Sequence, residues 1–144
     1  YEICACLVGS EMCIRDRGAQ VQAFRHDPTE ALIVDVTFAT QNGVSAKEAM
    51  ELGKGPAIGY APLLDKGVTD GLKEAARRAG IPFQMEIMGR GTGTNADHVA
   101  VSRRGVRCGL VSIPQRNMHT PVEVCDLKDI EQTAQLLAAY VLGE

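Results

Sequence analysis

The sequence predicts an α/β fold, in which a layered α/β/α sheet packs between helices. Apolar, β-branched runs typical of strands alternate along the chain with segments whose apolar residues recur at helical spacing. Glycine and proline separate these segments. The 144-residue chain is 45% apolar and 23% charged, as expected for one globular domain or a part of one.

The first half of the chain contains two expected strands and one expected helix. Residues 31–37, ALIVDVT, are predicted to form a buried strand, and residues 56–60 a short strand. Residues 40–51 are predicted to be mainly loop. Asp65 is expected to cap a helix over residues 66–79, which Gly80 ends.

The second half repeats the alternation. Its expected elements are, in order, a strand at 83–88, a glycine-rich loop at 89–95, a short helix at 96–104, a strand at 107–113 and a last helix that Asp126 caps. The strand at 107–113 is predicted to be buried and to stop at Pro114. No internal repeat or linker divides the chain.

A histidine and an aspartate are the residues best placed for chemistry. His119 follows a predicted strand in a loop stiffened by Pro121, at the rim where open α/β sheets bind ligands. Asp35 interrupts an otherwise apolar strand, where a carboxylate is costly unless it is paired, hydrogen-bonded or bound to a metal. On these grounds alone, a polar surface residue or a satisfied aspartate remains an alternative to a metal ligand.

The loop around His119 resembles the metal-binding histidine loop of the glutamyl-aminopeptidase group of dinuclear metallopeptidases, some members of which are called endoglucanases. That loop reads approximately I-S-I-P-x-R-x-x-H-[ST]-P-x-E. The matching residues are Val111-Ser112-Ile113-Pro114, Arg116, His119-Thr120-Pro121 and Glu123. The family's D-V-T strand end matches Asp35-Val36-Thr37, and its G-T-G-T-D-A loop resembles residues 89–95, with Asn95 in place of the aspartate.

The resemblance implies a metalloaminopeptidase that removes N-terminal residues from peptides with two divalent ions, zinc or cobalt. It implies that Asp35 binds one ion and His119 the other, and that the protein is a homo-oligomer. Residues near the substrate would be Gly91, Thr92, Gly93 and Arg116. The resemblance extends over about residues 17–141, so residues 18–144 are expected to be the C-terminal part of the catalytic domain.

The sequence departs from the family upstream of this region. It lacks the H-x-D motif, the bridging aspartate and the Glu-Glu pair. By the family's spacing, Met12 and Cys13 occupy the two positions of the Glu-Glu pair. We therefore assign no catalytic base and expect the chain as given to be an inactive fragment. Residues 1–17 are expected to be a sequencing artefact, because SEMCIRDR resembles translated adapter read-through, or else a disordered natural terminus.

Composition argues against several other classes of protein. A net charge of −3 and the absence of a long apolar run disfavour nucleic-acid and membrane partners. Five cysteines without a CxxC motif are typical of a reduced, cytoplasmic chain. Two alternatives stay open: a non-catalytic α/β assembly module, and a glycosidase, although no pair of acids suited to glycoside cleavage is evident.

Overall fold

A computed structural model describes residues 17–143 of the chain. Its elements are α2 (Arg17–His26), β1 (Glu30–Phe38), β2 (Ala57–Tyr60), α3 (Lys66–Arg78), β3 (Gln84–Ile87), α4 (Ala96–Val99), β4 (Arg107–Arg116), β5 (Val124–Cys125) and α5 (Leu127–Leu142). The predicted artefact or disordered terminus falls on residues 1–17, of which 1–16 lie outside the described part. Among residues 17–143, no helix is long and apolar enough to cross a membrane.

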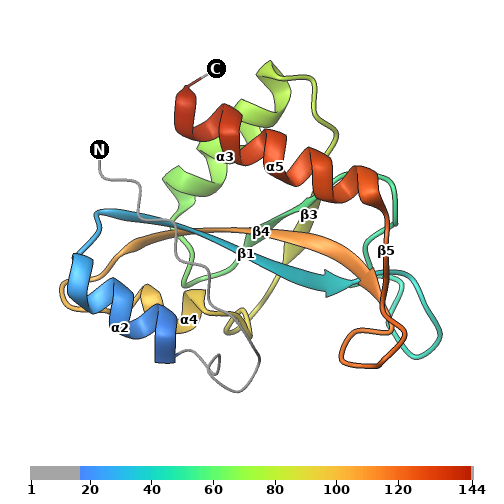
Figure 1. The fold of residues 1–144 in the computed structure, drawn as a ribbon, viewed down its shortest axis with the longest axis horizontal. Helices are drawn as coiled ribbons and strands as arrows, with labels where there is room; N and C mark the ends of the chain where they lie inside the picture. Colours follow the sequence, from blue (N-terminus) through green and yellow to red (C-terminus); the bar gives the residue numbers. More distant parts are fainter. Residues whose placement is uncertain (1–16, 144) are drawn as a thin grey trace.

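The strands form one mixed sheet in the order β1-β4-β2-β3, and β5 pairs with the end of β4. β1 runs parallel to β4, and β2 runs parallel to β3, whereas β2 and β4 are antiparallel. Helices α3 and α5 cover one face of the sheet, and α2 and α4 cover the other (Figure 1). The predicted α/β/α layering is therefore confirmed.

Alternate residues of the strands feed two apolar cores, one on each face of the sheet. Ile58 and Val111 pack with Val68 and Leu72 of α3 and with Leu136 of α5. The opposite core contains a second group of buried apolar side chains, among them Ala23, Val99, Cys108 and Leu110. The period-two alternation of β4 thus divides its side chains between the two helical layers.

The two long helices begin where the sequence predicts. The Asp65 side chain accepts a hydrogen bond from the Val68 amide, and that of Asp126 accepts one from Lys128. The prediction of a helix over residues 96–104 is wrong in its length, because α4 ends at Val99. Arg103 and Gly105 then adopt positive φ angles of 49° and 91°, which turn the chain out of the helical path.

Helix α2 was not predicted, and its side chains explain why. Ala23 is its buried residue, while Val21 and Phe24 remain 62% and 59% exposed. Its larger apolar residues therefore do not mark the face that packs on the protein, and the usual periodic signal is missing.

The prediction that residues 31–37 form a buried strand is wrong in its burial. Within the described residues β1 is an edge strand that pairs only with β4, and Val34 and Phe38 are 47% and 43% exposed. The apolar run correctly predicts a strand, but burial also depends on how many neighbours the strand has in the sheet.

The prediction that the last sheet strand stops at Pro114 is also wrong, because β4 continues to Arg116. The Gln115 carbonyl accepts a hydrogen bond from the Ala39 amide at 2.8 Å, so Gln115 faces β1. The nitrogen of Pro114 therefore faces the other side of β4, beyond Ser112, where pairing with β2 has already ended. No ladder hydrogen bond is lost there, and proline is tolerated.

A buried carboxylate joins the last helix to the loop before β2. Asp129, fully buried in the first turn of α5, accepts hydrogen bonds from the Gly53 and Gly55 amides, both at 2.8 Å. Gly55 has a φ of +91°, and a Cβ there would lie 2.0 Å from the Pro82 carbonyl oxygen. This loop therefore requires both the glycine and the buried acid.

Candidate metal and substrate site

Asp35 lies on β1 directly opposite Ser112 of β4. Its half-buried side chain is on the same face of the sheet as the buried Thr37 and Ser112. One carboxylate oxygen, Oδ1, accepts a hydrogen bond from the Val36 amide at 2.8 Å. The carboxylate is thus held close to its own backbone near the carboxyl end of the strand.

Glu86 joins this polar cluster from β3, two strands from Ser112 and three from Thr37, and sequence analysis missed it. Its Oε1 accepts a hydrogen bond from the Thr37 hydroxyl at 2.5 Å, and its Oε2 accepts one from the Ser112 hydroxyl at 2.7 Å. The intervening strand β2 presents only Ala57 and Gly59 on this face, so the side chain can pass over it. Those small residues were the one available signal, and it is a weak one.

His119 lies in the loop between β4 and β5. The residue is exposed and has a φ of +66°, and its amide donates a hydrogen bond to Glu123 Oε1 at 2.7 Å. A cavity of about 290 Å³ is lined by His119, Thr120, Pro121 and Glu123. Because β1 and β4 are parallel, this loop and Asp35 lie toward the same end of the sheet.

Two side-chain hydrogen bonds connect the chain after β1 to the last residue of β4 and to the residue that follows it. Arg116 Nε donates to the Thr40 carbonyl at 2.9 Å, and the Asn117 amide donates to Gln41 Oε1 at 2.6 Å. They fix the segment that follows Asp35 against the segment that precedes His119. Arg116, expected near the substrate, is exposed and makes one of these contacts, and its role toward a substrate stays a prediction.

The glycine-rich loop is held by Asp97, the second residue of α4. The Asp97 carboxylate accepts hydrogen bonds from the Thr92 amide and hydroxyl, both at 2.8 Å, and from the Gly93 amide at 3.0 Å. Partial burial acts to raise the pKa of Asp97, but these hydrogen bonds outweigh it and hold the pKa below its usual value. Asn95, which stands in place of the family's aspartate, makes no side-chain cap.

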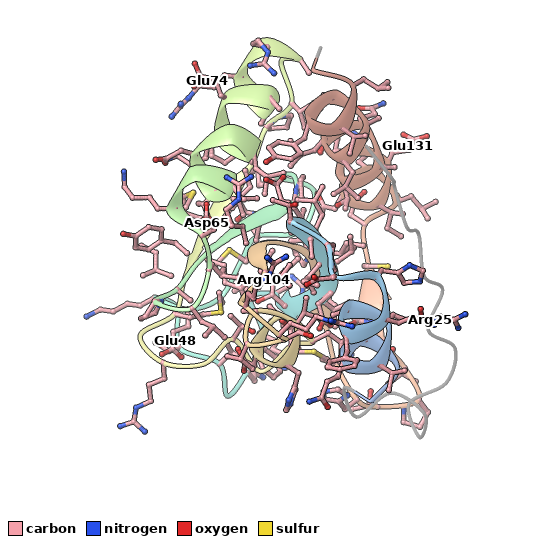
Figure 2. All side chains as sticks on the ribbon, turned by 90° about the vertical axis from the view of Figure 1, so that its left-hand side faces the viewer. Arg25, Glu48, Asp65, Glu74, Arg104 and Glu131 are labelled. Carbon is pink, nitrogen blue, oxygen red and sulfur yellow. The ribbon has the colours of Figure 1, made fainter. Side chains whose placement is uncertain are left out.

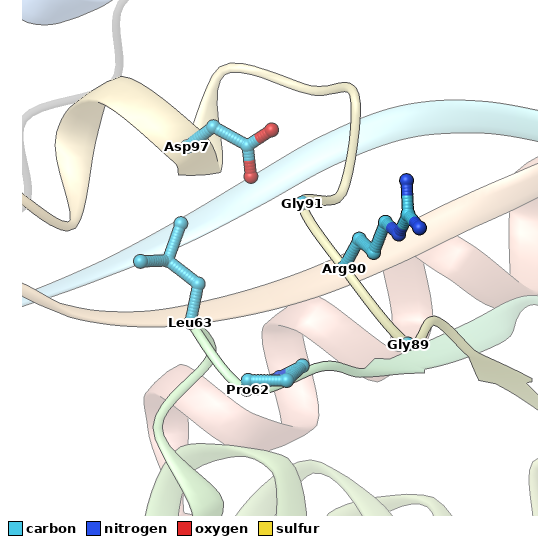
Figure 3. A pocket seen from close by; sticks show the side chains of 6 residues that line it. All are labelled: Pro62, Leu63, Gly89, Arg90, Gly91 and Asp97. Atoms are coloured by element: carbon cyan, nitrogen blue, oxygen red, sulfur yellow. The ribbon is translucent and has the colours of Figure 1, made fainter.

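The same loop borders a second cavity, of about 540 Å³ (Figure 3). Pro62, Leu63, Gly89, Arg90, Gly91 and Asp97 line it. Figure 3 shows the Asp97 carboxylate directed toward the loop at Gly91. Because β3 is antiparallel to β4, this loop leaves the sheet at the end opposite to the His119 loop. The sequence-predicted residues therefore fall into two groups. Asp35, Arg116 and His119 lie toward one end of the sheet, and Gly91, Thr92 and Gly93 lie toward the other.

The donors near β1 and β4 fit a divalent transition metal in kind. Carboxylate and imidazole are ordinary ligands of zinc and cobalt. In number they do not make a full site: the part of the chain described here contains no group of three or more His, Cys, Asp or Glu residues that could hold an ion. These residues could supply two ligands to a larger site.

Comparisons with known proteins show what the whole chain is similar to. The family model described as M42 glutamyl aminopeptidase matches residues 13–136. The lysyl aminopeptidase of Pyrococcus furiosus is 39% identical over 125 residues, which are 87% of this chain and 36% of that protein. The chain thus spans little more than a third of the length of this curated relative.

Solved structures give the same result. A TET aminopeptidase from a marine-sediment Thaumarchaeota archaeon superposes with a TM-score of 0.79 at 32% identity, over 87% of this chain and 36% of that one. An aminopeptidase from Desulfurococcus kamchatkensis gives 0.78 at 36% identity, over 88% and 37%. A Thermotoga maritima protein described as an endoglucanase gives 0.64 at 30% identity, over 83% and 36%.

Proposed function

The chain belongs to the M42 glutamyl aminopeptidase family, and from that membership we propose that it forms part of a metal-dependent aminopeptidase that removes N-terminal residues from peptides. The structural observation that supports this proposal is the parallel pairing of β1 with β4. It places a carboxylate and an imidazole, 84 positions apart in the sequence (119 − 35), toward one end of the sheet.

In this proposal Asp35 and His119 each bind one of two divalent ions, zinc or cobalt. Such ions polarise a scissile carbonyl and lower the pKa of a bound water. The residues of this chain hold the two ligands in place: the Val36 amide holds the Asp35 carboxylate, and the hydrogen bonds of Arg116 and Asn117 tie the two ligand segments together. Arg116, at the end of β4 that leads to His119, would face the peptide close to the ions. Gly91, Thr92 and Gly93 would contact the peptide from the loop at the opposite end of the sheet, and the protein would be a homo-oligomer.

The 144-residue chain should be inactive by itself, because its described part offers no third metal ligand near these two. The direct test is therefore a chimera in which residues 17–142 replace the matching third of the Pyrococcus furiosus lysyl aminopeptidase. The chimera should release N-terminal residues from short peptides and no sugar from glucan. The reverse result would favour the glycosidase alternative, and release of neither product would favour a non-catalytic module.

Two substitutions in the chimera test the ligand assignment. Asp35→Asn and His119→Gln should each lower kcat/KM by about a hundredfold or more and lower the bound metal content, since even indirect disturbance of a metal ligand costs 10- to 100-fold. His26→Gln is the matched control, because this exposed histidine lies on α2 and bonds to Gln22. Full activity and full metal content in either ligand variant would contradict the assignment.

A further inference from the structure

We propose that Glu123 is a positioning residue that sets the orientation of the His119 imidazole. The inference rests on the proposed role of His119 as a metal ligand. Its basis is the 2.7 Å hydrogen bond from the His119 amide to Glu123 Oε1, together with the left-handed backbone of His119, φ +66°. The proposed function names Asp35 and His119 as metal ligands and gives Glu123 no role.

The backbone of His119 adopts a conformation that an external partner can stabilise. A non-glycine residue in the left-handed region places its Cβ close to the following carbonyl oxygen, so this conformation is unfavourable without compensation. The Glu123 carboxylate provides it, because a charged acceptor forms a stronger hydrogen bond with a backbone amide than a neutral acceptor does. The φ angle in turn sets the direction of the Cα–Cβ bond, from which the imidazole extends.

The other hydrogen bonds of the loop involve residues 117, 120 and 122, so the Glu123 carboxylate is the acceptor that holds the amide of residue 119. Thr120 Oγ1 donates to the Asn117 carbonyl at 2.7 Å, and Asn117 Nδ2 donates to the Val122 carbonyl at 3.2 Å. These hydrogen bonds close the loop at residues 117, 120 and 122. At residue 119 the backbone is fixed by the side chain of Glu123, which also borders the cavity beside the imidazole.

The amide signal of His119 tests the contact without any metal. In the ¹⁵N-labelled chain, Glu123→Ala should move this signal and accelerate its hydrogen exchange about tenfold or more, whereas Glu123→Gln, which keeps a carbonyl acceptor, should change it less. Glu131→Ala is the matched control, because this exposed residue of α5 points away from the protein (Figure 2). An unchanged His119 amide in Glu123→Ala would overturn the proposal.

Cobalt binding tests the consequence for the ligand. Paramagnetic Co²⁺ added to the chain should broaden the ring signals of His119, and Glu123→Ala should weaken that effect about tenfold or more, the range found when the support of a ligand is removed. Glu123→Gln should stay within about threefold of the parent chain if orientation matters. An equal loss in Glu123→Gln and Glu123→Ala would overturn the proposal and make Glu123 itself a charged ligand.

The two measurements separate this inference from the proposed function. If Co²⁺ leaves His119 unaffected in the parent chain while the amide experiment gives the expected result, the metal role of His119 fails and the positioning contact is upheld. If Co²⁺ broadens His119 equally in the parent chain and in Glu123→Ala, the metal role is upheld and the positioning role fails.

Discussion

At the scale of single residues, acidic side chains in this protein fix loops by accepting backbone hydrogen bonds. Asp97 binds the glycine-rich loop, Asp129 binds the loop at Gly53 and Gly55, and Glu123 binds the His119 amide. A carboxylate is suited to this because each oxygen can accept more than one donor. The sequence analysis predicted none of these contacts. The Asp129 contacts span 76 and 74 positions, so only the fold brings their partners together. Asp97 and Glu123 bond to partners four or five positions away, and those contacts depend on the conformation of their loops.

The Asp97 contact predicts a dependence of loop order on pH. The pKa of Asp97 is lower in the folded chain than its usual 3.8, so the contact is fully present above that value and is lost as the pH falls through the lower, folded pKa. Hydrogen exchange at the Thr92 and Gly93 amides should therefore show a local opening below about pH 4.

The matched substitutions separate this local effect from general acid unfolding. Asp97→Ala should give rapid exchange at the same two amides already at neutral pH. Asp70→Ala, which removes a surface carboxylate of α3 paired with Lys66 and Lys73, should not. Slow exchange of Thr92 and Gly93 in Asp97→Ala would show that Asp97 does not hold the loop.

At the scale of elements, the sequence predicts those features that depend on residues close together in the chain. It gives the caps of α3 and α5 because an aspartate before an apolar-periodic segment is a local signal. It gives the strand that contains Asp35 and the loop that contains His119 from short apolar runs and prolines. The sequence does not predict the exposure of β1, which depends on how the strand pairs in the sheet. It also does not predict that β4 continues past Pro114, which is possible because pairing with β2 ends before that residue.

Packing of α3 on the sheet depends on a residue without a side chain. A Cβ at Gly109 would lie 2.5 Å from Val68 Cγ1 and 3.1 Å from Leu72 Cδ1. Gly109→Ala should therefore lower the free energy of unfolding by about 1–3 kcal/mol through overpacking, as measured by urea denaturation. Gly89→Ala, with no atom within 4 Å of the added Cβ, should change it by less than about 0.5 kcal/mol. Equal effects would rule out this packing explanation.

At the scale of the whole molecule, the sheet described here has an open edge. One side of β1, nine residues long, has no partner strand among residues 17–143, and the exposed Val34 and Phe38 lie along it. Long apolar edge strands pair with other chains unless charge or cover prevents it. The Pyrococcus furiosus relative, which is more than twice as long as this chain, has additional polypeptide to cover such an edge.

This edge predicts self-association of the isolated chain. Val34→Lys should reduce concentration-dependent association in light scattering, because a lysine on an edge strand opposes pairing with a second copy. Val141→Lys, at a 46% exposed position on α5, is the control and should leave association unchanged. Association that persists undiminished in Val34→Lys would place the contact elsewhere.

The pairing of β1 with β4 also has a consequence for the order in which the protein folds. Asp35 and Ser112 are partners in the sheet although 77 positions separate them (112 − 35), with β2, α3, β3 and α4 made in between. Contacts of such long sequence separation close late and slow the folding of a chain. During synthesis, Asp35 leaves the ribosome long before His119 exists, so the two proposed metal ligands can come together only after most of the domain has been made.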